Sequence, residues 1–334
     1  MVNTMAKKKT IKKIKKKATI YKQSQSFLKK HEADLRLLLV PVILFIILQI
    51  ITIFVRSVEQ QKGRIVIATQ SALVPVASYT FFTRRITPPI TAEAALILDR
   101  DSKNVLYEKN ADVRFSMAST TKVMTALVAL DYFKPDDILT AFTSNVQGVN
   151  AGVEVGDRLY FKDALYAMLL PSGNDIALMI AQNYPGGFEA FIKKMNQKAK
   201  ALHLTNTHFA DPAGLNDDGN YTTARELTQL ASEASSNKFL ADVVATRSKV
   251  ISTMDGTKTL VLTNLNELLG QHGVTGFKTG HTEGAGDVLV TSAVMHGHTY
   301  ILVVMRSQNR FSDTQILLAS LTTDVTTFIP KLSN

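Results

Sequence analysis

The stretch Arg114-Phe-Ser-Met-Ala-Ser-Thr-Thr-Lys-Val-Met-Thr-Ala126 decides how the rest of the chain is interpreted. Within it, Ser119 opens an apolar-periodic pattern that predicts a helix over about 119–131. Residues i and i+3 lie on one face of a helix, so the Lys122 ammonium can reach the Ser119 hydroxyl. A serine is a poor nucleophile until a neighbour takes its proton, and a lysine can do so if its pKa falls. The spacing therefore predicts a serine that a lysine activates.

Two further motifs follow in order, Ser172-Gly-Asn174 and Lys278-Thr-Gly280. The K-T-G pattern occurs once, and Lys278 could supply the second positive charge that lowers the pKa of Lys122. The S-x-x-K and S-x-N patterns recur at Ser26–Lys29, Ser235–Lys238, Ser102–Asn104, Ser235–Asn237 and Ser307–Asn309. Context separates them, because Ser26 lies in a lysine-rich arm and Ser235 in a polar run, whereas Ser119 begins an apolar helical pattern.

From residue 94 onward, strands are expected at both ends of the region, with helices between them. The expected strands cover 94–99, 104–108, 246–252, 257–262, 275–280, 287–295 and 299–306. The expected helices cover 119–131, 162–170, 174–183, 187–202, 223–235 and 312–328. This order favours an α/β (α+β) protein with an antiparallel sheet and an inserted helical region.

Charge is concentrated at the N-terminus. Residues 1–36 hold eleven Lys and Arg36 against Glu32 and Asp34, which accounts for the whole net charge of +10. The rest of the chain is neutral, so a nucleic-acid-binding domain is not expected. The chain has no Cys, which excludes thiol catalysis, disulfides and Cys-based zinc sites.

An uncharged run of 19 residues over 37–55 follows this basic arm. As a helix it would extend roughly 28 Å, close to the thickness of the hydrocarbon layer. We expect an uncleaved, single-pass membrane anchor here, with a cleaved signal peptide or a buried core helix as alternatives. Positive residues favour the cytoplasmic side, so the chain after the span is expected outside the cell membrane. The expected organisation is a basic cytoplasmic arm (1–36), a transmembrane helix (37–55), a linker (56–91) and a catalytic domain (92–330).

With its motifs in this order, the chain resembles the serine penicillin-binding proteins and β-lactamases, and within them the low-molecular-mass D-alanyl-D-alanine carboxypeptidases. The resemblance covers most of residues 92–315. It is carried by the three motifs and by Val105-Leu-Tyr-Glu-Lys-Asn110, Asp211-Pro-Ala-Gly-Leu215, Tyr221-Thr-Thr-Ala-Arg-Glu226 and Gly284-Ala-Gly286. It implies the DD-peptidase/β-lactamase-like fold, an antiparallel sheet flanked by helices with a helical subdomain.

The resemblance also implies residue roles. Ser119 is the nucleophile and Lys122 the general base, Ser172 relays a proton to the leaving amine, and Asn174 orients Lys122 and substrate. Lys278, Thr279 and Arg310 lie at the substrate's terminal carboxylate, and Gly280 lets a strand approach the substrate. The backbone N–H groups of Ser119 and His281 form the oxyanion hole. The implied partners are peptidoglycan peptides ending in D-Ala–D-Ala and inhibitory β-lactams, and no cofactor or metal is implied.

Alternatives remain within this resemblance. A DD-endopeptidase or transpeptidase would use the same residues. A class A-like β-lactamase is less favoured, because no E-x-x-L-N segment lies between the S-G-N and K-T-G motifs. A non-catalytic penicillin-sensing or wall-binding module would have been indicated by loss of Ser119, Lys122 or Lys278, and all three are present.

Other pairs of polar residues receive structural interpretations. His296-Gly-His298 is expected to be a hairpin turn rather than a metal site. Asp136-Asp137 and Asp217-Asp218 are expected to be solvated turns rather than carboxylate pairs.

Overall fold

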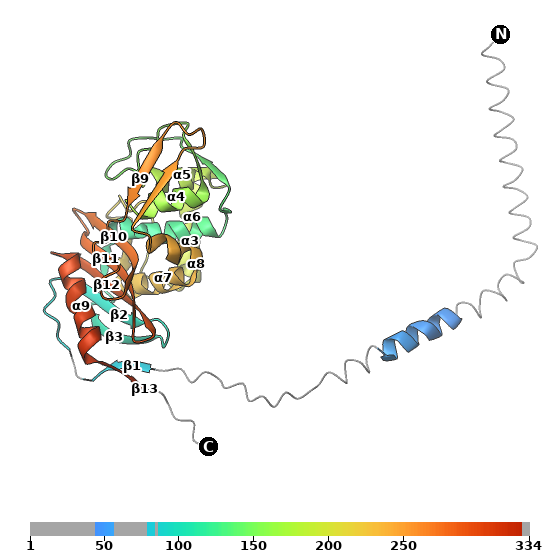
Figure 1. Cartoon of the computed structure of the whole chain (residues 1–334), viewed down its shortest axis with the longest axis horizontal. Coiled ribbons are helices and arrows are strands. Elements are labelled where there is room, and N and C mark those ends of the chain that lie inside the picture. Colours follow the sequence, from blue (N-terminus) through green and yellow to red (C-terminus); the bar gives the residue numbers. More distant parts are fainter. Residues whose placement is uncertain (1–43, 57–78, 84–85, 329–334) are drawn as a thin grey trace, which may run out of the picture. The chain divides into compact units, whose positions relative to one another are not determined.

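The computed structural model describes residues 44–56, 79–83 and 86–328. Its main sheet has five antiparallel strands in the order β10-β11-β12-β2-β3 (Figure 1). These strands are β2 (Ala94–Asp99), β3 (Asn104–Lys109), β10 (Val274–Thr282), β11 (Gly286–Met295) and β12 (His298–Ser307). The sheet joins the two ends of the domain, since β12 pairs with β2. The expected antiparallel sheet flanked by helices is therefore confirmed.

The sheet is covered on both faces, which explains why its inner strands are apolar without alternation. Side chains of a strand point to opposite faces in turn. Leu96 accordingly joins a core that includes Leu227 of α7 (Ala224–Ser236), whereas Ile97 joins a core that includes Leu317 of α9 (Arg310–Asp324). Figure 1 shows α7 and α9 on opposite sides of the sheet.

Within the domain, the other helices that the structure describes form a lobe beside the sheet (Figure 1). They are the 3₁₀ helix η1 (Ala118–Thr121), α3 (Lys122–Leu130), α4 (Phe161–Leu169), α5 (Asn174–Asn183), α6 (Gly187–Ala201) and α8 (Lys238–Val244). Helix α3 is buried along nearly its whole length among α4, α5, α6 and α7. The expected helix over 119–131 is therefore a 3₁₀ turn followed by an α-helix, and α3 holds the motif at the centre of the lobe.

Short two-stranded sheets join the loops of this lobe. They pair β4 (Arg114–Ser116) with β7 (Tyr221–Thr223), β5 (Ile138–Thr140) with β6 (Arg158–Tyr160), and β8 (Ser248–Ser252) with β9 (Thr259–Thr263). The β8–β9 pair corresponds to the strands expected at 246–252 and 257–262. The β4–β7 pair fixes the entry to η1, because Ser116 lies opposite Tyr221 in the register.

Two expectations near the domain ends are wrong. The helix expected over 312–328 ends at Asp324, and residues Val325–Phe328 form strand β13. Strand β13 pairs with β1 (Tyr79–Phe82), which lies in the segment expected to be a linker. The Thr80 hydroxyl of β1 donates a 2.5 Å hydrogen bond to Asp99 Oδ2 of β2. The folded domain therefore includes residues before position 92.

The N-terminal part of the chain is described only over residues 44–56, which form a helix. These residues overlap the expected span at 37–55, whereas 37–43 and the whole basic arm lie outside the described residues. Within the described ranges, no helix is both long and apolar enough to cross a membrane.

Candidate active site

Ser119 is the second residue of η1 and lies three positions before Lys122, the first residue of α3. Its neighbour Ala118 has a positive φ of 47°. The loop at Gly214 packs on this turn so closely that a Cβ there would lie 1.9 Å from the Ala118 carbonyl oxygen. The turn that presents the serine is therefore held by backbone packing.

Lys122 is fully buried and its Nζ atom reaches three oxygen acceptors. It donates to Ser119 Oγ at 2.8 Å, to Asn174 Oδ1 at 2.6 Å and to the Ala213 carbonyl oxygen at 2.8 Å. Burial lowers the pKa of Lys122 to about 7, although the Asp211 and Asp175 carboxylates act in the opposite direction. Near neutral pH, a substantial fraction of this lysine is therefore an unprotonated amine beside the serine.

The middle motif lies on the loop before α5. Ser172 has a φ of 69°, which turns the chain so that Asn174 begins the helix. Asn174 accepts from Lys122 and donates through Nδ2 to the Gln147 carbonyl oxygen at 2.7 Å. These two contacts fix the orientation of its amide, with the oxygen toward the lysine.

Lys278 approaches the same site from β10. Its Nζ atom donates to Ser172 Oγ at 3.0 Å and to the Thr279 carbonyl oxygen at 2.9 Å. Its side chain is buried, and burial followed by the charges of Lys122 and Arg310 holds the pKa of Lys278 well below its ordinary value. Lys278 therefore holds Ser172, while Lys122 holds Ser119 and Asn174, and the two lysines are close enough for their charges to interact.

The outer end of β10 carries the remaining candidate residues. Arg310, the first residue of α9, donates through Nη1 to the Gly280 carbonyl oxygen and to Asp287 Oδ1, each at 3.0 Å. His281 is exposed, and its Nδ1 atom lies 2.8 Å from the same Asp287 oxygen. The structure thus brings a guanidinium to the end of β10 that adjoins η1.

Strand β10 is an edge strand of the main sheet and packs against η1. A Cβ at Gly280 would lie 3.1 Å from Ala118 Cβ and 3.2 Å from the Ser119 backbone nitrogen. A side chain here would therefore crowd η1, and glycine allows the close approach without a shift of its neighbours. The approach places the backbone around Gly280 beside the N–H group of the serine.

Three supporting groups were not assigned a role from the sequence. The Ala213 carbonyl oxygen accepts a hydrogen bond from Lys122 Nζ. Asp211 accepts from the N–H groups of Ala213 and Gly214, so it fixes the turn that carries this carbonyl. Asp175 accepts from the N–H groups of the loop at 151–153. An acidic residue next to Pro or Asn in a turn signals such backbone capping, but not its partner.

The other polar pairs have structural roles. His296 and Gly297 have positive φ and form the turn between β11 and β12, as expected. His298 Nδ1 lies 2.9 Å from Asp99 Oδ2, an oxygen that also accepts from Thr80. Asp136 and Asp137 lie in the loop before β5, where Asp136 pairs with Lys162 across an exposed surface.

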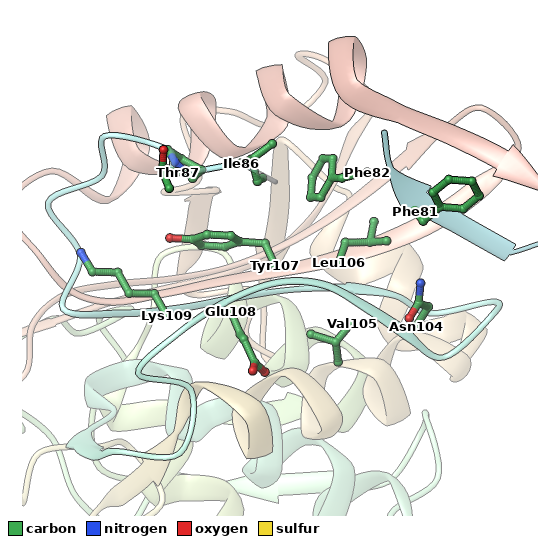
Figure 2. Close-up of a pocket in the computed structure, with 11 residues that line it drawn as sticks. Phe81, Phe82, Ile86, Thr87, Asn104, Val105, Leu106, Tyr107, Glu108 and Lys109 are labelled. Carbon is green, nitrogen blue, oxygen red and sulfur yellow. The ribbon is translucent and has the colours of Figure 1, made fainter. Parts of the chain in front are cut away.

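A separate pocket lies between β1 and β3, lined by Phe81, Phe82, Leu106 and Tyr107 among others (Figure 2). None of the candidate site residues lines it. This pocket is therefore separate from the site at Ser119.

The comparisons with known proteins agree with this geometry. A family model described as D-alanyl-D-alanine carboxypeptidase matches residues 82–309. The chain is 33% identical over 254 residues to a D-alanyl-D-alanine endopeptidase of Escherichia coli strain K12, covering 74% of this chain and 82% of that protein. It is 36% identical over 250 residues to a D-alanyl-D-alanine endopeptidase of Pseudomonas aeruginosa, covering 72% and 80%. The crystal structure of the Streptomyces K15 DD-transpeptidase matches with a TM-score of 0.66 at 34% identity, covering 70% of this chain and 98% of that one.

Proposed function

The chain belongs to the D-alanyl-D-alanine carboxypeptidase family of serine peptidases, and on that premise we propose that Ser119 cleaves the D-Ala–D-Ala bond of peptidoglycan stem peptides. The observation that carries this assignment is the buried Lys122 amine, 2.8 Å from Ser119 Oγ. A base in hydrogen-bond contact with the nucleophile, with a pKa near the working pH, suits general-base catalysis.

In the acylation step, Ser119 Oγ attacks the carbonyl carbon of the penultimate D-alanine while neutral Lys122 takes the hydroxyl proton. The carbonyl oxygen becomes an oxyanion, which the N–H groups of Ser119 and His281 can stabilise. The C–N bond then breaks, and the proton held by Lys122 passes through Ser172, which contacts Lys278, to the leaving amine, so that Lys122 is neutral again. Free D-alanine and an ester on Ser119 remain.

In the second step, water attacks the ester and its proton passes to Lys122. The carbon–Oγ bond breaks, Ser119 recovers its proton, and the shortened peptide leaves as a carboxylic acid. A β-lactam mimics the acyl-D-Ala–D-Ala group and forms the same kind of ester. We expect this adduct to persist, because the chain lacks the glutamate segment that class A β-lactamases use for deacylation.

Binding of the substrate carboxylate is assigned to the outer end of β10. Lys278, Thr279 and Arg310 lie there, and Arg310 is anchored by Asp287 at 3.0 Å. A guanidinium held in this way can donate a charge-assisted hydrogen bond to a carboxylate. Because β10 is an edge strand, its backbone can also pair with an extended peptide.

The test is incubation of the full-length protein in detergent with a pentapeptide ending in D-Ala–D-Ala. We expect release of one D-alanine per peptide, and none from the Ser119→Ala variant. If neither D-alanine release nor penicillin labelling of the wild-type protein occurred, the assignment would be wrong, and a non-catalytic wall-binding module would replace it.

Endopeptidase activity is the second candidate. Its basis is that the relatives from E. coli and P. aeruginosa are named endopeptidases and match this chain over about four-fifths of their length. The distinguishing substrate is a cross-linked peptide dimer, supplied beside the pentapeptide. Faster cleavage of the dimer assigns an endopeptidase, whereas cleavage of the pentapeptide alone assigns a carboxypeptidase.

The location at the membrane is also a proposal. Residues 37–55 are uncharged and follow twelve basic residues. We place the N-terminus in the cytoplasm, the span in the cell membrane, and the catalytic domain outside, where peptidoglycan lies.

A further inference from the structure

Asp217 connects two segments that meet at the mouth of the candidate site. Its Oδ1 atom accepts from Ser116 Oγ at 2.6 Å and from Thr282 Oγ1 at 2.5 Å. Its Oδ2 atom accepts from the Gly284 backbone N–H at 3.1 Å. One carboxylate therefore joins the end of β4 to the end of β10 and to the turn that follows.

These segments carry the groups that the reaction requires. Ser116 is the last residue of β4, three positions before Ser119. Thr282 is the last residue of β10, immediately after His281. The two proposed oxyanion donors, the N–H groups of Ser119 and His281, thus lie on the segments that Asp217 holds together.

Asp217 and the turn at Gly284 are in close contact. A Cβ at Gly284 would lie 2.7 Å from Asp217 Oδ2, so the glycine is what allows the carboxylate to reach the turn. Asp217 is half-buried, whereas its neighbour Asp218 is exposed. Both residues lie in a turn, as expected, but the Asp217 carboxylate is hydrogen-bonded within the protein rather than solvated.

Hydrogen bonds rather than an ion pair define this position. Among the described residues, no Lys, Arg or His side chain forms an ion pair with Asp217, and its two side-chain donors are hydroxyl groups. A neutral amide could accept from both hydroxyls through its oxygen, but its nitrogen could not accept from Gly284.

We propose that Asp217 is a positioning residue for acylation, which sets the separation of the two backbone N–H groups that stabilise the oxyanion. The proposal rests on the function assigned to Ser119 above. Oxyanion donors act only when they are held at hydrogen-bond distance from the developing charge. A displacement of about 1 Å at a reacting centre lowers the rate on the order of a hundredfold.

The experiment compares Asp217→Ala, Asp217→Asn and the matched control Asp218→Ala in the full-length protein. Three quantities are measured: the single-turnover rate of Ser119 acylation by penicillin, kcat and KM for D-alanine release, and the melting temperature. We expect Asp217→Ala to lower the acylation rate and kcat about 10- to 100-fold with little change in KM. We expect Asp217→Asn to recover most of this loss, and Asp218→Ala to match the wild type.

Hydrogen–deuterium exchange of the peptide spanning residues 281–286 gives a readout that does not depend on activity. We expect faster exchange in Asp217→Ala and wild-type exchange in Asp218→Ala. The proposal is overturned if Asp217→Ala acylates at the wild-type rate, even with a lower melting temperature, or if its exchange at 281–286 is unchanged. A wild-type protein that fails to acylate would overturn the assigned function instead, and the exchange comparison would still decide whether Asp217 holds the two segments.

Discussion

The Nζ atom of Lys122 and the Oγ atom of Ser119 are 2.8 Å apart, and this contact lies inside a site where the lysine is fully buried. Burial disfavours the charged ammonium form, so the lysine can lose its proton near neutral pH. The Asn174 and Ala213 oxygens hold the amine in place. The relationship thus supplies both a base and its orientation toward the nucleophile.

Lys122→Ala is expected to abolish acylation of Ser119. A serine without its base loses at least about a thousandfold in rate. The matched control is Lys238→Ala, because Lys238 also follows a serine by three residues but is exposed and pairs with Asp242. Labelling with a fluorescent penicillin measures the rate, and circular dichroism checks the fold. Near wild-type labelling of Lys122→Ala would exclude Lys122 as the base.

The rate of acylation should rise with pH through an apparent pKa of about 7. Lys122 acts as a base only when neutral, so the active fraction is lost as pH falls below this pKa. At pH 5 the rate should be about a hundredfold below its plateau. Lys278 interacts with Lys122, so the measured value belongs to the pair of lysines. A rate that is constant from pH 5 to 9 would contradict this assignment.

A reporter fused after residue 91 should be active outside the cytoplasm, whereas one fused after residue 36 should be active inside. The reason is that all net charge of the chain precedes the uncharged run at 37–55. Each fusion is made with two reporters, one that is active only in the cytoplasm and one that is active only outside it, and the activity of both is measured. Activity of the residue-91 fusion in the cytoplasm would contradict the proposed topology.

Local patterns were sufficient where the chemistry is local. The i, i+3 spacing of Ser119 and Lys122 predicted their contact, and the apolar runs predicted the strands of the main sheet. The pairing of β1 with β13 was not predictable, because it joins segments about 240 residues apart whose short sequences carry little periodic signal. The carbonyl oxygen of Ala213 was missed for a similar reason, since a backbone acceptor leaves no mark in residue type.

Interpretation of the aspartates shows the same limit. Asp217 and Asp218 are adjacent and chemically identical, and their sequence context predicts a solvated turn for both. The structure distinguishes them, because Ser116 and Thr282 converge on Asp217 from positions 101 and 65 residues away. Such convergence depends on tertiary packing, which spacing along the chain does not report.

Gly214→Ala is expected to destabilise the domain and to impair Ser119. Gly214 has a φ of 85°, and a Cβ there would lie 1.9 Å from the Ala118 carbonyl oxygen. The overlap requires movement of the turn that presents the serine, at a cost on the order of 2 kcal/mol or more. Gly156→Ala is the matched control, because Gly156 has a φ of 96° but no atom within 4 Å of such a Cβ. Thermal unfolding and penicillin labelling of both variants test this, and equal effects at the two sites would contradict it.

Penicillin should form one lasting adduct, on the peptide that contains Ser119. The chain has three S-x-x-K serines, and the structure describes two of them. Ser119 Oγ accepts from the buried Lys122. Ser235 Oγ instead donates to the Ser232 carbonyl oxygen, and the lysine three positions later is engaged with Asp242.

Mass spectrometry after penicillin treatment and proteolysis locates the adduct, with Ser119→Ala and Ser235→Ala as paired controls. The first variant should carry no label, and the second should be labelled as the wild type is. Rapid penicillin hydrolysis without a lasting adduct would favour a β-lactamase. An adduct at Ser26 or Ser235 would show that the S-x-x-K motif was assigned to the wrong serine, since neither the lysine geometry nor its lowered pKa would then bear on the reacting group.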